Sequence, residues 1–145
     1  MADELMIRNE EDQNFIADLT GEHVCSYCSF TPETIEQKAH LYNLMSEPEF
    51  RIGDCINKII NVQHVYVESV PCTNVETGEV RMCPRVILID NEGHGYQSVS
   101  VGIFSSVKRI FAMFGEPAYW EKPIPIEIKQ VTKGKNKMLT LKVAL

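Results

Sequence analysis

The sequence predicts a mainly β domain in which five strands form a small barrel and one helix joins the third strand to the fourth. A long strand over residues 58–70 carries apolar side chains on both faces, as a strand shared by two halves of a barrel does. Residues 85–115 then read as strand, tight turn, strand and helix, and two alternating strands follow. This order is that of a five-stranded OB-like Greek-key barrel. A plain α+β sheet with the same elements is the alternative.

The stretch over residues 85–115 sets this order. Val86–Ile89 is a continuous β-branched run, which indicates a strand covered on both faces. Asp90–Gly93 predicts a turn closed by a glycine at positive φ, and residues 94–100 alternate as the next strand. Apolar side chains then recur every three or four residues, which predicts a helix capped by Ser100 and ended by Gly115. Its apolar face is formed by Ile103, Val107, Ile110, Phe111 and Phe114.

Two further strands are predicted after this helix. Isoleucines alternate with other residues over 124–128, and Leu and Val alternate with Thr and Lys over 139–143. The basic run Thr132–Lys137 is the turn between them, and Pro71–Glu79 is the loop between the first two strands of the barrel. Trp120 is expected to pack beneath the end of the helix rather than to stack on a base.

The charge distribution divides the chain into an acidic N-terminal extension, residues 1–50, and the barrel domain, residues 51–145. The extension has eleven acidic side chains against Arg8 and Lys38, a net charge of −9. The remainder has twelve Lys and Arg against nine Asp and Glu, a net charge of +3. Thr31 as N-cap and Pro32 as first helical residue predict one helix over about 32–46 in the extension. The stripe expected to pack on the sheet is Ile35, Ala39, Tyr42 and Met45. A short helical piece is expected at Phe15–Leu19.

Composition indicates an ordinary globular protein of the cytoplasm. Of the 145 residues, 44% are hydrophobic and 23% are charged, and no apolar run approaches the ~20 residues of a membrane span. The acidic N-terminus does not resemble a signal peptide, so the five cysteines are expected to be free thiols. Cys72 and Cys83 would be directly opposed in a regular hairpin, close enough to crosslink, although two free thiols are the favoured interpretation.

No motif predicts catalysis, and we expect neither an enzyme nor a cofactor. There is no P-loop, no glycine-rich dinucleotide motif and no local nucleophile motif. Cys25 and Cys28 form half of a structural zinc site that His23 and His40 could complete, but the spacing matches no standard pattern. We favour free thiols and no metal.

A nucleic-acid interface is better supported, because a groove for single strands needs cations for phosphates and flat side chains for bases. Cations and tyrosines converge on the face formed by strands 1 to 3 and loops 1–2 and 4–5 of the predicted barrel. For both tyrosines the alternative to base stacking is a position in the hydrophobic core. The candidate binding residues are Tyr66, Arg81, Arg85, Tyr96, Lys129, Lys133, Lys135 and Lys137. Lys108 and Arg109 are interpreted as the solvated face of the helix.

Five segments carry a family resemblance: Thr77–Glu79, Arg85–Gly93, Tyr96–Ser100, Ile110–Trp120 and Thr132–Leu141. With them, the portion from about Glu76 to Leu145 resembles single-stranded-DNA-binding proteins of bacteriophages and related mobile elements. The resemblance implies an OB-like barrel that coats single-stranded DNA without sequence preference during replication, in the host bacterial cytoplasm for a phage-encoded protein. It also implies cooperative or oligomeric binding. Many such proteins carry an acidic partner-binding segment at the C-terminus, whereas here the acidic segment is N-terminal.

We therefore expect a single-stranded-DNA-binding protein with DNA as its partner, replication proteins as further partners, homo-oligomers and no membrane association. The alternative is an accessory module that binds proteins through its acidic, helix-bearing N-terminal segment and does not bind nucleic acid. A zinc-dependent protein using Cys25, Cys28 and histidines is the third hypothesis.

Overall fold

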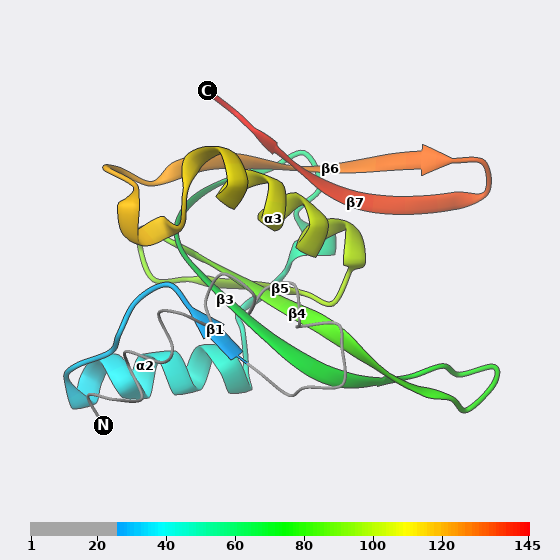
Figure 1. Cartoon of the computed structure of the whole chain (residues 1–145), viewed down its shortest axis with the longest axis horizontal. Helices are drawn as coiled ribbons and strands as arrows, with labels where there is room; N and C mark the ends of the chain where they lie inside the picture. The colour runs from blue at the N-terminus through cyan, green and yellow to red at the C-terminus, as the bar shows by residue number, and fades with distance from the viewer. Residues whose placement is uncertain (1–25) are drawn as a thin grey trace.

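The computed structural model describes residues 26–145, which form one curled, open sheet between two α-helices (Figure 1). Helix α3 packs on one face of the sheet and α2 on the other. The strands follow the order β2-β5-β4-β3-β6-β7, and β1 pairs with β3 outside this path. The elements are β1 (Ser26–Cys28), α2 (Ile35–Ser46), β2 (Phe50–Arg51), η1 (Ile52–Asp54), β3 (Ile59–Thr73), β4 (Val80–Asp90), β5 (Gly95–Ser98), α3 (Val101–Phe114), η2 (Pro117–Tyr119), β6 (Ile124–Lys133) and β7 (Asn136–Val143).

The long strand β3 is the centre of the sheet, as the sequence predicts. It pairs with β6 at its start and with β4 along most of its length. A register shift between Val62 and His64 reverses which side chains face the core. Before the shift Ile60 and Val62 are buried, and after it Val65 and Val67 are buried. The irregularity explains why apolar residues appear on both faces of this segment in the sequence.

The predicted barrel is not closed. The pairs β3–β4, β4–β5, β3–β6 and β6–β7 are present, but β5 and β7 are not neighbours in the described sheet. The N-terminal half of α3 packs against β7 instead. Gly102 lies so close that a Cβ placed on it would collide with the carbonyl oxygen of Leu139. The hydroxyl of Ser106 accepts a hydrogen bond from the amide of Leu141 at 3.2 Å. The helix therefore fills the gap that strand pairing was expected to close.

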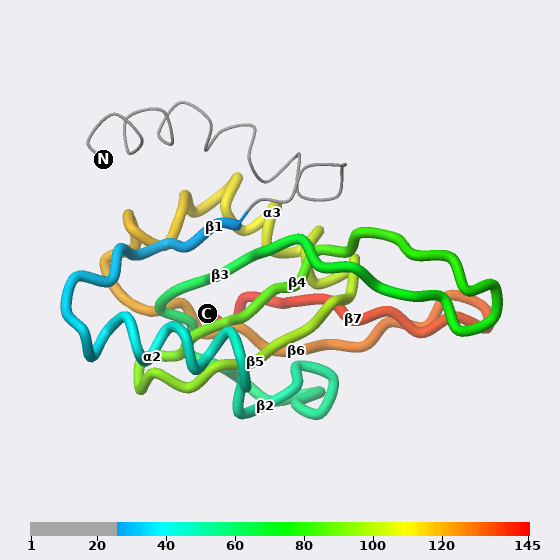
Figure 2. Tube along the Cα trace, turned by 90° about the horizontal axis from the view of Figure 1, so that it is seen from below, coloured from blue at the N-terminus to red at the C-terminus, as the bar shows by residue number. Residues whose placement is uncertain are grey.

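Two hydrophobic clusters hold the layers together. The larger one lies between α3 and the concave face of the sheet, where Ile103, Phe104 and Val107 are at most 2% exposed. Each such side chain contributes about 2 kcal/mol when it leaves water. The smaller cluster lies on the opposite face and joins Leu44 of α2 to Tyr66, Ile87 and Ile89. Figure 2 shows α2 running along this second face beside β5.

Helix α2 starts three residues later than the sequence predicts. Thr34 is its N-cap and forms a reciprocal capping box with Gln37, which the predicted cap Thr31 does not. Of the predicted apolar stripe only Met45 packs on the sheet, because Ala39 is exposed and Ile35 and Tyr42 are 81% and 68% exposed. The side chains that pack on the second cluster are Leu41, Leu44 and Met45.

The second helix and the turns agree with the sequence more closely. Helix α3 follows Ser100, whose side chain forms no capping hydrogen bond, and ends at Gly115, whose φ is +80°. Phe114 of the predicted apolar face is 42% exposed, because it lies at the end of the helix beyond the sheet core. Gly93 has a φ of +89° in the β4–β5 turn. The basic turn is tighter than expected, because β6 extends to Lys133 and β7 starts at Asn136.

The β3–β4 register shows that Cys72 and Cys83 are not directly opposed, contrary to the expectation for a regular hairpin. Cys72 lies opposite Arg81, and Cys83 lies opposite Val70. The loop tip is shifted because the side chain of Asn74 accepts hydrogen bonds from the amides of Glu76 and Thr77. The cysteines at 55, 72 and 83 are free thiols. Within residues 26–145 no helix is long and apolar enough to cross a membrane. The predicted helical piece at Phe15–Leu19 lies outside the described residues.

Candidate nucleic-acid interface

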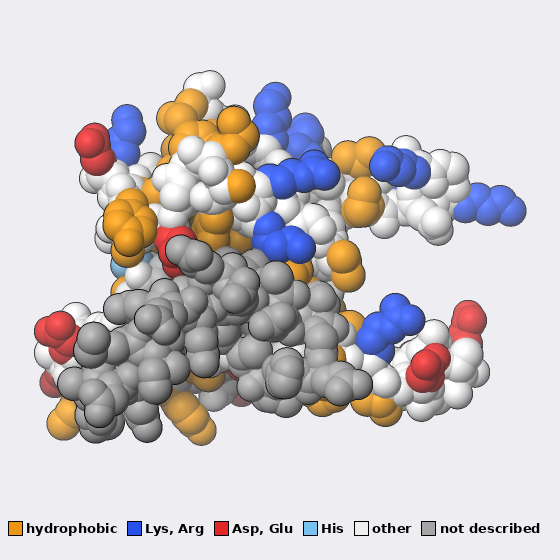
Figure 3. Space-filling model, viewed as in Figure 1, with side chains coloured by type: hydrophobic (Ala, Val, Ile, Leu, Met, Phe, Trp, Pro, Cys, Tyr) orange, Lys and Arg blue, Asp and Glu red, His pale blue; other side chains and the backbone are white. Residues whose placement is uncertain are grey.

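Two long hairpins project from the same side of the molecule (Figure 1). One is formed by β3 and β4 and ends in the loop 74–79; the other is formed by β6 and β7 and turns at Gly134 and Lys135. Figure 3 shows an open notch between the two hairpins, with the N-terminal part of α3 near its base. These are the two loops at which the sequence analysis predicts binding of a single-stranded nucleic acid.

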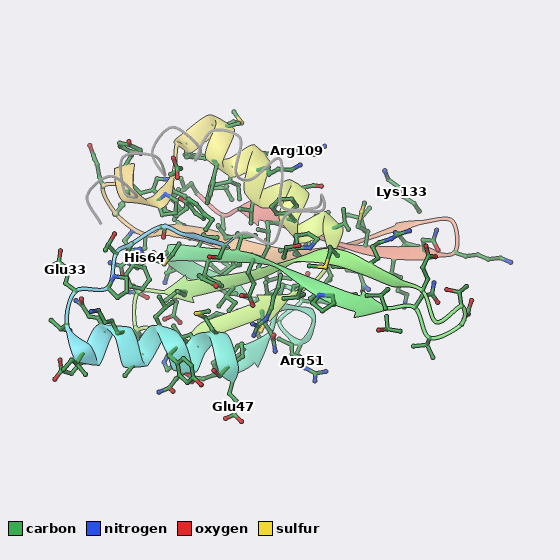
Figure 4. The ribbon with its side chains drawn as sticks, turned by 60° about the horizontal axis from the view of Figure 1, so that its bottom comes forward. Glu33, Glu47, Arg51, His64, Arg109 and Lys133 are labelled. Carbon is green, nitrogen blue, oxygen red and sulfur yellow. The ribbon has the colours of Figure 1, made fainter. Side chains whose placement is uncertain are left out.

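Lys and Arg side chains gather over α3 and the β6–β7 hairpin (Figure 3). No Asp or Glu occurs in α3 or after Glu127, which lies in β6 opposite Lys142 and within 3.7 Å of the Lys129 ammonium group. Figure 4 shows Arg109 and Lys133 pointing into solvent on the same side of the sheet, whereas Glu47 and Arg51 lie on the α2 side. We call this set of exposed cations the basic surface: Lys108, Arg109, Lys133, Lys135, Lys137 and Lys142.

The opposite wall of the notch is weaker in positive charge. Arg81 is exposed on β4, but Glu76 and Glu79 lie in the adjoining loop and oppose its charge. Apolar side chains are exposed on both walls. Val80 is 63% exposed on one hairpin, and Val131 and Met138 are 38% and 37% exposed on the other. The notch thus combines cations with aliphatic surface.

Two predicted phosphate ligands are already paired within the protein. Arg85 donates from Nη1 to Glu68 Oε1 at 2.8 Å and from Nε to Gln97 Oε1 at 3.2 Å, and its side chain is 14% exposed. Lys129 donates to Asn57 Oδ1 at 3.0 Å. A phosphate would have to displace these partners. The structure therefore does not bring Arg85 and Lys129 together with the hairpin lysines.

The two predicted stacking residues also occupy other environments. Tyr66 is 5% exposed beneath α2, and burial raises the pKa of its hydroxyl, which donates to Glu68 Oε2 at 3.0 Å. Burial, with a hydrogen bond to Asp90, raises the pKa of Tyr96 to about 12. The ring of Tyr96 stacks on Phe50 with centroids 5.0 Å apart. Tyr66 therefore occupies a core position, which was the alternative to a stacking role. Its buried ring offers no face to a base in this conformation.

The α2 side of the sheet is unfavourable for phosphates. A hollow there is lined by Glu47, Glu49 and Asp54 as well as by Arg51 and Arg85. Phe50, which is 42% exposed, borders the same hollow. A polyanion would meet three carboxylates at this position, so the charge distribution favours the notch over the α2 side.

The sequence interpretation missed Lys108 and Arg109. In the sequence they read as an ordinary solvated helix face, and nothing local links them to the hairpin lysines 24 to 29 positions further on. Only the packing of α3 against β7 brings the two groups to one side. Trp120 lies as predicted: it donates to the carbonyl of Gly115 at 2.9 Å and packs against Phe111 beneath the helix end.

The zinc hypothesis concerns residues at the boundary of the described chain. Cys25 and His23 lie outside it, and Cys28 is partly buried in β1. Among residues 26–145, no three His, Cys, Asp or Glu side chains are grouped closely enough to hold a metal ion.

Comparison with known proteins identifies the class to which this fold and surface belong. A family model described as phage single-stranded DNA-binding protein matches residues 20–144. This is most of the chain, so the protein belongs to the Phi29-type family of phage single-stranded DNA-binding proteins. No curated protein and no solved structure matches the chain significantly.

Proposed function

We propose that the protein coats single-stranded DNA without sequence preference during phage DNA replication. The observation that carries the proposal is the basic surface on a member of this family. Its cations are long, exposed Lys and Arg side chains on a helix and a hairpin, which suit a flexible phosphate chain.

The DNA would run through the notch and over α3. Phosphates would contact Lys133, Lys135 and Lys137 on the hairpin and Lys108 and Arg109 on the helix. Arg81 would contact the strand from the other wall. Aliphatic side chains such as Val131 and Met138 would lie against sugars and bases, since the two hairpin tips contain no aromatic residue.

The order of the elements supports an OB-like origin of the sheet. Strands β3, β4, β5, β6 and β7, with α3 between the third and fourth, follow the order of an OB barrel. In this proposal α3 takes the place of the missing closure, and residues 1–50 and 51–145 are an extension and a barrel-derived domain. The protein acts by binding rather than by catalysis, in the host cytoplasm, with homo-oligomers on DNA and replication proteins as partners.

The test is a titration of fluorescein-labelled oligo(dT) and oligo(dA) with the full chain at low salt, followed by anisotropy. We expect a Kd in the micromolar range or below, similar for the two sequences and much weaker at high salt. Duplex DNA is the competitor that checks the preference for single strands. Absence of binding at micromolar protein would reject the proposal in favour of the protein-interaction alternative.

A further inference from the structure

The exposed side of α3 is apolar at its C-terminal end, beyond the cations. Met113 is 84% exposed, Phe114 42% and Tyr119 of the adjoining η2 helix 79%. Figure 3 shows hydrophobic side chains over this end of α3 and over η2. We call these three residues the apolar patch. Large exposed apolar groups that lie together on a folded surface indicate a binding site.

The patch and the cations lie on one rigid element. Lys108 and Arg109 precede Met113 by about one helical turn, and the inner side of the helix is fixed in the core by Phe104 and Ile110. Any ligand that covers the patch and continues along the helix therefore meets two positive charges. Its expected chemistry is apolar residues next to carboxylates.

The first residues of the described chain contact the C-terminal end of α3, the end that carries this patch. The ring of Tyr27 in β1 is 5.8 Å from that of Phe111, and its hydroxyl donates to Glu116 Oε1 at 2.6 Å. Figure 2 shows β1 close to α3. Residues 1–25 precede this point, and at roughly 3.3 Å per extended residue they exceed the length of α3 several times.

The preceding segment has the expected chemistry. Residues 1–19 lie outside the family match and contain six carboxylates against the single Arg8. Phe15, Ile16 and Leu19 stand among these acids, with Asp12 and Asp18 as near neighbours. Its sequence is thus complementary in both polarity and charge to the exposed side of α3.

We infer that residues 1–19 dock on α3, with Phe15, Ile16 and Leu19 on the apolar patch and their acidic neighbours near Lys108 and Arg109. While docked, the segment competes with single-stranded DNA for these two cations. A second copy of the chain fits less well. A two-fold contact would place each patch on the other and bring Lys108 and Arg109 of both copies together, which is repulsive. The competition rests on the proposed function, whereas the docking does not.

Docking is tested on the full chain by NMR of ¹³C-methyl methionine, with Met113 as the reporter. Phe15→Ser with Leu19→Ser removes two of the three apolar anchors and keeps every charge. We expect the Met113 methyl signal to move toward the position of a solvent-exposed methionine in this variant. The control is Val75→Ser, which changes an exposed apolar residue on the far hairpin and should leave the signal in place. An unchanged Met113 signal in the double variant, or a signal that shifts only with protein concentration, would overturn the docking.

Competition is tested separately with oligo(dT). Glu10→Gln, Glu11→Gln, Asp12→Asn and Asp18→Asn remove four charges from the segment, and we expect the Kd at low salt to fall about threefold to tenfold. The gain should vanish at high salt, because screening weakens both interactions. An unchanged Kd beside a shifted Met113 signal would overturn the competition. A chain that does not bind oligo(dT) would reject the proposed function, and the Met113 signal would still decide the docking.

Discussion

Gly102 in the first turn of α3 lies against the backbone carbonyl of Leu139 in β7, with no room for a side chain between them. At this contact α3 packs against β7, the strand that would pair with β5 in a closed barrel. The contact also positions Lys108 and Arg109 relative to the hairpin lysines. A change at Gly102 therefore affects the edge of the sheet and the basic surface together.

Substitution of Gly102 by Ala should lower the free energy of unfolding by about 2 kcal/mol, the usual range for overpacking a core. The gain in helix propensity from Gly to Ala is at most about 1 kcal/mol and does not compensate. Urea unfolding followed by circular dichroism measures the change. Gly53→Ala is the control, because a Cβ there would meet only Leu139 Cδ1 at an ordinary 3.8 Å. Equal stability of the two variants would contradict the close contact.

Arg85 should prove to be a structural residue. Because its guanidinium is 14% exposed and paired with Glu68, Arg85→Ala should lower the free energy of unfolding by about 2 kcal/mol. The affinity for oligo(dT) should change less than twofold. Arg81→Ala is the matched variant on the same strand and should weaken binding with little loss of stability. If Arg85→Ala weakens DNA binding more than Arg81→Ala, the assignment of the two roles is reversed.

The three lysines at the β6–β7 tip should account for part of the salt dependence. Each phosphate contact on single-stranded DNA contributes about 0.7 to the slope of log Kd against log salt, so Lys133→Ala, Lys135→Ala and Lys137→Ala together should reduce it by about 2. Anisotropy titrations between low and moderate salt give the slope. Lys122→Ala, an exposed lysine between η2 and β6, is the control and should leave the slope unchanged. The same slope in the triple variant and the original chain would exclude the tip from the interface.

His94 should make the stability depend on pH. A hydrogen bond with the Glu49 carboxylate at 3.0 Å raises the pKa of His94 above its ordinary value of 6.5. Because the folded-state pKa is the higher one, the contribution is complete below about pH 6.5 and is lost as the pH rises through the folded-state pKa. Glu49→Gln should therefore lower stability at pH 6 and have little effect at pH 9.

Urea unfolding at several pH values, with an NMR titration of the His94 ring, checks this prediction. Glu92→Gln is the comparison, since Glu92 lies farther from the ring at 3.5 Å and is the smallest cause of the shift. An equal loss of stability at pH 6 and pH 9 in Glu49→Gln would show that the pair is not coupled to the protonation of His94.

The elements that local sequence patterns determine were predicted well. The two-faced apolar pattern around Val62 reflects a register shift, and the spacing of Ile103, Val107 and Ile110 reflects the buried face of α3. Gly93 and Gly115 have the positive φ that their turn and cap require. In each case the signal and the structure lie within a few residues of each other.

Features that depend on distant packing were not predicted. Helix α2 has two apolar stripes of similar spacing, and only contact with Ile87 and Ile89 selects the one with Leu44. Burial of Tyr66 depends on α2 covering that face of the sheet. The side chain of Arg85 is occupied because Glu68 stands opposite it in the register. Lys108 and Arg109 join the candidate interface only because α3 packs against β7.

The central claim is that single-stranded DNA lies on the basic surface and not on the α2 side of the sheet. Amide chemical shifts of ¹⁵N-labelled full-length protein, recorded with and without oligo(dT) at low salt, test it most directly. We predict the largest changes at Lys108, Arg109 and residues 133–137. Changes confined to the α2 side, at Glu47, Arg51 and Gln97, would contradict the account.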